Sequence, residues 1–305
     1  MDHTTFLEIF RADQILLDEP MKNHTTFRVG GKCCIMLLPN SIDQIRQAIY
    51  KCKEKCIKYC VIGNGSNLIV PDKGYNGVVI KVGKSFNGYK IIPDDTTVGD
   101  VSIYAESGIL LPTLANVCLK HNLSRLEFVA GIPGTLGGGI YMNAGAYGGE
   151  LSQVVSQVYV LNDQNDVTIF SNEECNFGYR KSRMQQEKNI ILAAVLKLKP
   201  SEHDEINQKM RELSKMRTEK QPLNFPSAGS TFKRPEGNFA GKLIEDAGLS
   251  GYAIGAAAVS EKHCGFIINK GGATASDVLN LVEHVQNIVL KKFGVMLELE
   301  PEILQ

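Results

Sequence analysis

This sequence lacks a net charge, a membrane-spanning apolar run and a signal peptide, and these three absences exclude several classes of protein. It carries 33 basic and 33 acidic residues, so no overall field draws it to nucleic acid or to an acidic membrane surface. No apolar run approaches the roughly 18 residues that span a bilayer. The N-terminus also lacks the basic region and apolar core of a signal peptide. We therefore expect a cytoplasmic protein with no nucleic acid, membrane or obligate protein partner.

Closely paired cysteines and metal-binding patterns are absent as well. None of the eight cysteines forms a CxxC pair, and a chain of 305 residues can fold without disulfides. We expect reduced thiols, with Cys52 and Cys56 on the buried face of a helix. His24, His121 and His263 are scattered without metal-ligand spacing, so we predict no metal site.

Hydrophobic residues make up 43% of the chain, which suits a soluble protein with a substantial core. Short strands mixed with a few helices predict an α+β fold in three parts, 1–85, 86–200 and 201–305. We expect strands at 33–38, 59–62, 77–82, 89–92, 101–105, 154–161, 167–170, 190–198, 265–269 and 295–300. We expect helices after Ser41, at 112–121, 202–218 and 240–247, and between Thr274 and Gly294. Ser41 with Gln44, and Thr274 with Asp277, predict capping boxes.

The stretch GIPGTLGGGIYMNAGAYGG, residues 131–149, contains eight glycines among nineteen residues and no charge. Glycine costs more backbone entropy on ordering than other residues, so this density indicates a backbone that approaches a ligand closely. A flexible linker is the alternative, but linkers are polar, whereas apolar residues are interleaved here. We therefore predict a packed, ligand-binding segment.

A second uncharged loop, GNGSN at 63–67, follows a predicted strand. It lacks the third glycine of a dinucleotide fingerprint, and GVVIKVGKS at 77–85 has the wrong spacing for a phosphate-binding P-loop. Two neutral loops could instead hold a diphosphate through backbone N–H groups, with Asn64, Ser66, Asn67 and Thr135 as polar side chains. This favours a long ligand such as a dinucleotide.

Several motifs together resemble one family. They are NHTTFRVGG at 23–31, GNGSNL, AGIPGTLGG with MNAGAYG, FGYRKS at 177–182, SAGSTFKRP at 227–235 and LEPEI near the C-terminus. Their order and near-complete coverage resemble the UDP-N-acetylenolpyruvoylglucosamine reductases, in the smaller variant of that family. Gly139 departs from the family, which more often has alanine there.

The resemblance implies a two-lobed FAD-binding fold of the vanillyl-alcohol-oxidase (PCMH) type, followed by a C-terminal α+β substrate-binding domain. It implies an NADPH-dependent flavoprotein of peptidoglycan precursor synthesis that reduces UDP-N-acetylglucosamine-enolpyruvate to UDP-N-acetylmuramate. The residues that would bind FAD are Gly63, Asn64, Gly65, Ser66, Asn67, Gly131, Ile132, Pro133, Gly134, Gly137, Gly138, Asn143, Gly145 and Ala146.

The same resemblance implies roles for five further residues. Hydride would pass from flavin N5 to the enolpyruvyl group, Ser230 would donate the proton, and Arg180 and Glu302 would lie beside the substrate carboxylate. Lys220 and Arg234 would hold the nucleotide-sugar diphosphate, although surface charge is the alternative for both. Taken singly, each of these residues is ordinary for a loop or a surface.

Two other functions fit part of the sequence. A flavin oxidase of the same fold, acting on an alcohol or sugar, would consume oxygen without NADPH. A nucleotide-binding module without catalysis would purify colourless. FGYRKS and SAGSTF argue against the oxidase.

Overall fold

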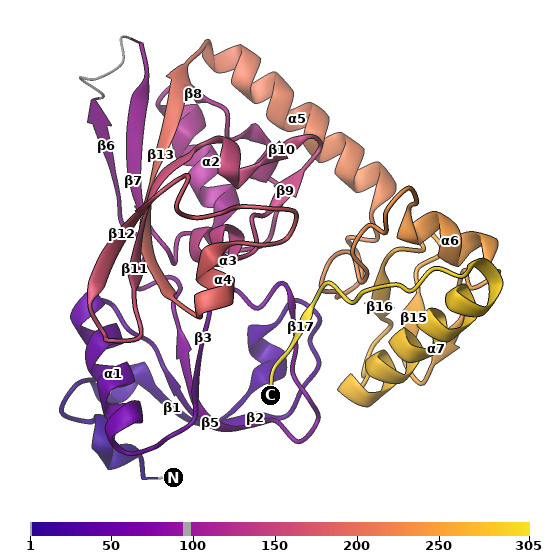
Figure 1. Cartoon of the computed structure of the whole chain (residues 1–305), viewed down its shortest axis with the longest axis horizontal. Coiled ribbons are helices and arrows are strands. Elements are labelled where there is room, and N and C mark those ends of the chain that lie inside the picture. The colour runs from indigo at the N-terminus through magenta and orange to yellow at the C-terminus, as the bar shows by residue number, and fades with distance from the viewer. Residues whose placement is uncertain (1, 94–98) are drawn as a thin grey trace. The chain divides into compact units, whose positions relative to one another are not determined.

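The computed structural model describes residues 2–93 and 99–305, and the chain forms two compact units (Figure 1). Unit 1 comprises Met1–Leu16, Ile35–Asn64 and Gly77–Arg217. Unit 2 comprises Leu17–Cys34, Gly65–Asn76 and Thr218–Gln305. The three-part division of the sequence stays a prediction.

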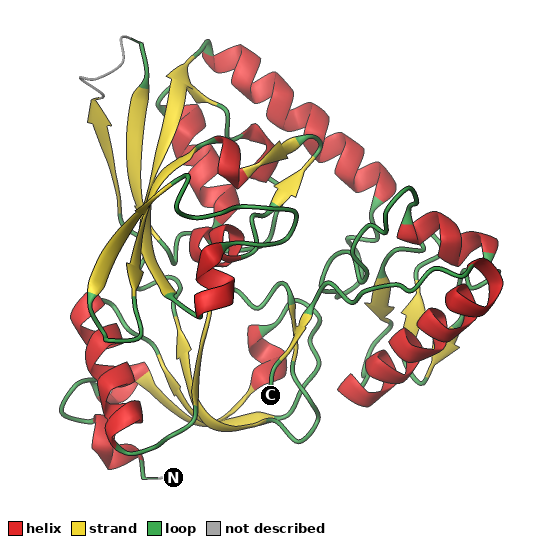
Figure 2. Cartoon of the chain, viewed as in Figure 1, coloured by secondary structure: helices red, strands yellow, loops and turns green. Residues whose placement is uncertain are grey.

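Figure 2 distinguishes the helices from the strands. The α-helices are α1 (Ile42–Glu54), α2 (Leu111–Lys120), α3 (Leu136–Tyr141), α4 (Arg183–Glu187), α5 (His203–Lys220), α6 (Ala240–Asp246) and α7 (Ala275–Phe293). Strands in the N-terminal half are β1 (Ile15–Pro20), β2 (Lys32–Leu37), β3 (Tyr59–Ile62), β4 (Leu68–Ile69), β5 (Tyr75–Lys81), β6 (Tyr89–Pro93), β7 (Val101–Glu106), β8 (Leu123–Ser124), β9 (Gly145–Ala146) and β10 (Gly149–Glu150). The later strands are β11 (Val155–Leu161), β12 (Val167–Ser171), β13 (Ile190–Pro200), β14 (Ala253–Ile254), β15 (Ala257–Val259), β16 (Ile267–Asn269) and β17 (Glu302–Ile303).

Unit 1 is built around a six-stranded antiparallel sheet. Its strands follow the order β12-β11-β13-β7-β6, and β8 also pairs with β13. Apolar residues of β7, β11 and β13 pack with those of α2 and α3 in one core. Burial of this size supplies the main stabilising free energy of a domain. The helix α3, which is part of the glycine stretch, therefore packs against a rigid sheet.

The predicted strand–helix–strand near the N-terminus is confirmed as β2, α1 and β3. The two strands β2 and β3 belong to a sheet with the order β1-β2-β5-β3, in which β3 and β5 are parallel. The loop GNGSN leaves the carboxyl end of β3 directly. Ligand loops commonly occupy this end of a strand in α/β units.

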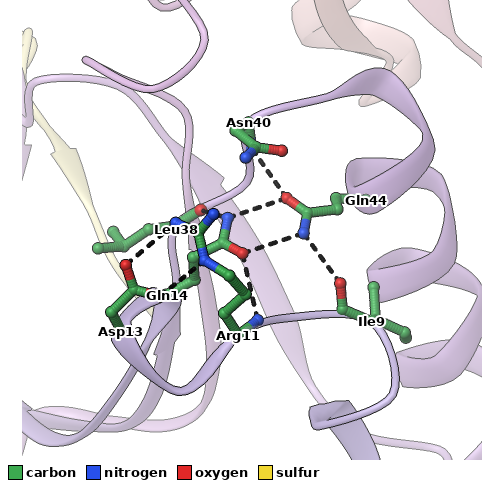
Figure 3. A network of polar contacts seen from close by, with 7 residues as sticks. All are labelled: Ile9, Arg11, Asp13, Gln14, Leu38, Asn40 and Gln44. Carbon is green, nitrogen blue, oxygen red and sulfur yellow. Dashed lines mark hydrogen bonds and ion pairs between the residues drawn. The ribbon is translucent and has the colours of Figure 1, made fainter.

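Only half of the capping box predicted for Ser41 and Gln44 is present at the start of α1. Ser41 Oγ does accept a hydrogen bond from the Gln44 N–H, at 3.2 Å. Gln44 Oε1, however, accepts from the Asn40 N–H at 2.9 Å, and Gln44 Nε2 donates to Ile9 O and Gln14 Oε1 (Figure 3). A tertiary network has thus replaced the local box, because the N-terminal segment presents acceptors within reach of this side chain.

Unit 2 packs α6 and α7 with a small antiparallel sheet, β14-β15-β16. Thr274 and Asp277 form the predicted capping box at the start of α7, and Gly294 ends the helix with φ +69°. The predicted strand at 295–300 is wrong, since the structure has only an isolated bridge at Leu299 there and β17 lies later.

The eight cysteines are all free thiols. Burial raises the pKa of Cys33 to about 11 and those of Cys52, Cys118 and Cys175 to about 12. Cys56 is exposed with φ +52°, so its predicted place on the buried face of α1 is wrong. It lies just beyond the helix, where the backbone reverses. Within the described residues, no group of three His, Cys, Asp or Glu could hold a metal. No helix in the same residues is long and apolar enough to cross a membrane.

Candidate active site

Two of the glycine-rich segments meet within unit 1. Asn64 Nδ2 donates a hydrogen bond to Pro133 O at 2.6 Å. A Cβ placed on Gly63 would lie 2.2 Å from Thr135 Oγ1, which is closer than any real side chain can approach. The missing side chain at Gly63 therefore lets the end of β3 touch the start of α3.

The glycine stretch is partly helical, which the sequence did not indicate. Thr135 caps α3, because its Oγ1 accepts a hydrogen bond from the Gly138 N–H at 3.4 Å. The Gly137 N–H donates to Ser107 O at 2.8 Å, and a Cβ on Gly137 would lie 2.7 Å from Ser107 Cβ. Ser107 is buried, and its Oγ has no hydrogen-bond partner among the described residues. Gly137 is therefore required for packing of α3 against the end of β7.

This packing divides the predicted cofactor residues into two groups. The N–H groups of Ile132, Gly137 and Gly138 already donate within the protein. Across residues 2–93 and 99–305, by contrast, the N–H groups of Gly63, Asn64, Gly131 and Gly134 have no protein acceptor. These four donors come from neutral segments, and that donor set suits an anionic group such as a diphosphate.

Arg180 lies in a tight turn of unit 1. Gly178 and Lys181 exchange two backbone hydrogen bonds of 3.0 and 3.2 Å, and Arg180 between them has φ +53°. The left-handed region is unfavourable for a residue with a Cβ, and such strain often marks functional positions. Arg180 Nη2 donates to Gly145 O at 3.5 Å, and its guanidinium lies 4.9 Å from the Tyr179 ring centroid.

Two buried side chains hold this turn in place. Asn143 Nδ2 donates to Gly178 O at 3.1 Å, while Asn143 Oδ1 accepts from the Ser152 N–H at 3.0 Å. Ser182 Oγ donates to Tyr141 O at 2.6 Å. Asn143 has an exposed fraction of 0%, and its side chain positions the Arg180 turn. Its contact with the cofactor stays a prediction.

Ser230 and Glu302 both belong to unit 2. Ser230 is half-buried and precedes Thr231, whose N–H donates to Gly265 O and whose O accepts from the Glu300 N–H. Thr231 Oγ1 also accepts from the Ile267 N–H at 2.8 Å. These bonds fix the backbone next to the half-buried Ser230.

The segment that carries Glu302 is held by the GNGSN loop. Asn67 Nδ2 donates to Glu300 O at 3.2 Å, and the Glu302 N–H donates to Asn67 O at 2.9 Å. Strand β17 then pairs in parallel with β4, which places Glu302 opposite Leu68. Glu302 is exposed. Asn67 thus holds the Glu302 segment through both its side chain and its backbone.

The remaining predicted site residues differ in their surroundings. In unit 2, Gly65 has φ +63°, and a Cβ there would lie 2.1 Å from His24 O. Lys220 is exposed at the end of α5. Arg234 is exposed, with its guanidinium 4.5 Å from the Phe239 ring centroid. Gly145 and Ala146 form β9, and Ser66 is half-buried.

Comparison with known proteins decides the family. Residues 35–170 match the model of the FAD binding domain, and residues 221–304 match that of the C-terminal domain of UDP-N-acetylenolpyruvoylglucosamine reductase. A UDP-N-acetylenolpyruvoylglucosamine reductase of Caldanaerobacter subterraneus subsp. tengcongensis is 50% identical over 296 residues, 97% of this chain and 95% of the relative. This chain belongs to the UDP-N-acetylenolpyruvoylglucosamine reductase family.

Solved structures agree with this assignment. The reductase of that family from Thermus caldophilus matches with a TM-score of 0.80 and 34% identity, covering 95% of this chain and 98% of the other. The glucose dehydrogenase Phl p 4.0202 shares the fold alone, with a TM-score of 0.51 and 12% identity over 66% of this chain and 44% of the other. The predicted α+β fold, an FAD-binding fold with a further C-terminal domain, is confirmed.

Proposed function

We propose that this chain is the FAD-containing, NADPH-dependent reductase that converts UDP-N-acetylglucosamine-enolpyruvate to UDP-N-acetylmuramate. The observation that carries this proposal is the 50% identity to reductases of that name across nearly the whole chain. Both domain models match in the expected order. Bound FAD supplies the hydride, which it takes beforehand from NADPH.

The backbone donors of unit 1 suit the diphosphate of FAD. The unpaired N–H groups of Gly63, Asn64, Gly131 and Gly134 are donors without neighbouring acidic side chains in their loops, as a diphosphate requires. Gly63 and Thr135 are in close contact, so this backbone is rigid before the ligand arrives. A preformed site avoids an ordering cost on binding.

Arg180 is proposed to bind the carboxylate of the enolpyruvyl group. When hydride reaches the terminal carbon, negative charge develops on the carbon next to that carboxylate and spreads into an enediolate. A guanidinium offers a fixed, permanently charged pair of donors to these oxygens. Because the charge is larger in the transition state than in the substrate, the interaction lowers the barrier.

Ser230 is proposed to donate the proton that completes the reaction at the same carbon. Its hydroxyl is a weak acid, but the enediolate is a strong base. Glu302 would contribute a hydrogen bond to the enediolate when its carboxyl carries a proton. Lys220 and Arg234 are proposed to hold the diphosphate of the nucleotide sugar.

A stepwise visible spectrum of the purified protein tests the function. We expect flavin absorbance, bleaching on anaerobic addition of NADPH, and return of the absorbance when the enolpyruvyl nucleotide sugar is added. In Ser230→Ala, NADPH should still bleach the flavin, while turnover falls by about 100-fold or more, as expected for loss of a proton donor. Ser227→Ala in the same loop is the matched control and should keep its turnover. A colourless protein, or an unchanged rate in Ser230→Ala, would contradict the corresponding part of the proposal.

A further inference from the structure

Arg217 occupies a position in α5 where an apolar residue would be expected. Ile206, Met210 and Leu213 form the face of α5 that packs inward, at spacings of four and three residues. Arg217 follows Leu213 by four residues and therefore continues the same face. This guanidinium is placed against unit 1 by the helix itself and is not a freely moving surface charge.

The side chain of Arg217 lies directly over the start of the glycine stretch. Its Cδ and Nη1 are each 2.9 Å from where a Cβ on Gly131 would stand. Gly131 is exposed, so the missing side chain leaves room for the arginine and for an approaching ligand. Tyr147, at the other end of the stretch, is close enough to act on the charge of Arg217.

Arg217 has no counter-ion in the part of the chain that the structure describes. Desolvation lowers the pKa of its guanidinium, and Tyr147 opposes this shift. Among the described residues, no carboxylate forms an ion pair with Arg217, and no protein group accepts a hydrogen bond from it. A half-buried cation without a partner is costly, and such groups are normally paired. The free protein therefore carries an unbalanced positive charge beside Gly131, whose N–H group is also unpaired.

We propose that Arg217 binds the diphosphate of a nucleotide ligand on the glycine stretch. This rests on the proposed function, which supplies two such ligands, FAD and the nucleotide sugar. A guanidinium fork suits paired phosphate oxygens, and the neighbouring N–H donors add directional hydrogen bonds. Gly131 and Tyr147 lie in the part of the chain that matches the FAD-binding domain, so FAD is the favoured source.

Flavin affinity and apoprotein stability together test the role of Arg217. FAD is removed from wild type, Arg217→Met and Arg217→Lys, and each is titrated with FAD and melted with and without it. We expect Arg217→Met to weaken FAD binding by roughly 10- to 100-fold, the loss of one charged hydrogen bond. The FAD-free variant should melt no lower than the wild type, because an unpaired charge has been removed. Arg217→Lys should fall between the two, and Arg211→Met, an exposed arginine of α5, is the control.

A second titration separates the two ligand sources. UDP-N-acetylglucosamine is added to the FAD-loaded proteins, and weaker binding confined to this ligand would assign Arg217 to the nucleotide sugar. Unchanged affinity for both ligands, or equal weakening in Arg211→Met, would overturn the proposal. If Arg217→Met does not fold, the Arg217→Lys titrations decide in the same way. A wild-type protein without flavin would instead contradict the proposed function.

Discussion

Candidate site residues in the two units illustrate two different ways of holding a backbone in place. In unit 1, Gly63 and Gly137 allow close contacts because they lack side chains, and an added methyl group would meet Thr135 or Ser107. In unit 2, polar side chains reach across long sequence separations, as Asn67 does to Glu300. We therefore expect the contacts of Gly63 and Gly137 in unit 1 to be damaged by added atoms, and polar contacts such as that of Asn67 in unit 2 by removed ones.

Asn269 offers the largest test of this contrast in unit 2. Its side chain is 4% exposed, Nδ2 donates to Phe27 O and Arg28 O, and Oδ1 accepts from the N–H groups of Gly271 and Ala273. Asn269→Ala would remove the side-chain partner of two carbonyls and two N–H groups, at a cost of about 3 kcal/mol in the free energy of unfolding. Denaturant unfolding measures this. Asn238→Ala, whose amide lies in an exposed turn, should change it by less than about 0.5 kcal/mol.

Gly63→Ala is the corresponding test in unit 1. The new Cβ would lie 2.2 Å from Thr135 Oγ1, which is buried at the cap of α3. Overpacking of this kind costs about 1–3 kcal/mol, and we expect a lower melting temperature and less bound flavin. Gly83→Ala is the control, since no heavy atom lies within 4 Å of its Cβ position. Equal behaviour of the two variants would contradict the role of close contact.

Asp72 tests the polar contacts of unit 2 through pH. Partial burial raises its pKa, but hydrogen bonds from Ser276 Oγ and from the N–H groups of Ser276 and Ala275 outweigh this and lower it overall. A lowered folded pKa stabilises the protein above the unfolded value, and the contribution disappears as the pH falls through the folded value. Asp72→Asn should therefore cost at most about 1 kcal/mol at pH 7, since the carboxylate is exposed, and little at pH 2. Melting curves at both pH values measure this difference, with Asp163→Asn as the control. An equal loss of stability at pH 7 and at pH 2 would show that the charge of Asp72 is not its cause.

Gly139→Ala should have the smallest effect. Its Cβ would lie 2.8 Å from Leu151 Cδ1 and 3.1 Å from Leu111 Cδ1, which are tips of flexible side chains and not backbone. Alanine gains up to about 1 kcal/mol of helix propensity over glycine, which offsets the crowding. We expect the melting temperature to change little, whereas Gly137→Ala in the same helix should lower it. A large fall in the melting temperature of Gly139→Ala would contradict this, because it would show that flexible side chains tolerate an added methyl group no better than rigid neighbours do.

Local chemistry explains which elements were predictable from sequence. Thr274, Asp277 and Gly294 define α7 correctly because cap residues act within one turn. Gln44 was misjudged because its partner Ile9 is distant in sequence. The helix α3 was missed because glycine is a poor helix former, and its support comes from Ser107 and the sheet.

The candidate site shows the same limit. The motifs predicted roles for Arg180, Ser230 and Glu302, but they did not indicate the hydrogen bonds that hold the surrounding backbone. Asn143 stays a predicted cofactor residue, but the sequence did not indicate that its buried amide holds the Arg180 turn. Arg217 was missed because a single arginine in a polar helix carries no signal until the buried face of α5 is known.

The cysteines differ in burial, and this difference makes local opening of each unit measurable. Cys118 and Cys175 are buried in the core of unit 1, Cys264 lies in the core of unit 2, and Cys56 is exposed. A thiol reagent should modify Cys56 at once and reach the others only when their surroundings open. The order in which these cysteines react, with and without FAD, would then reveal which unit loosens first and which one the flavin tightens.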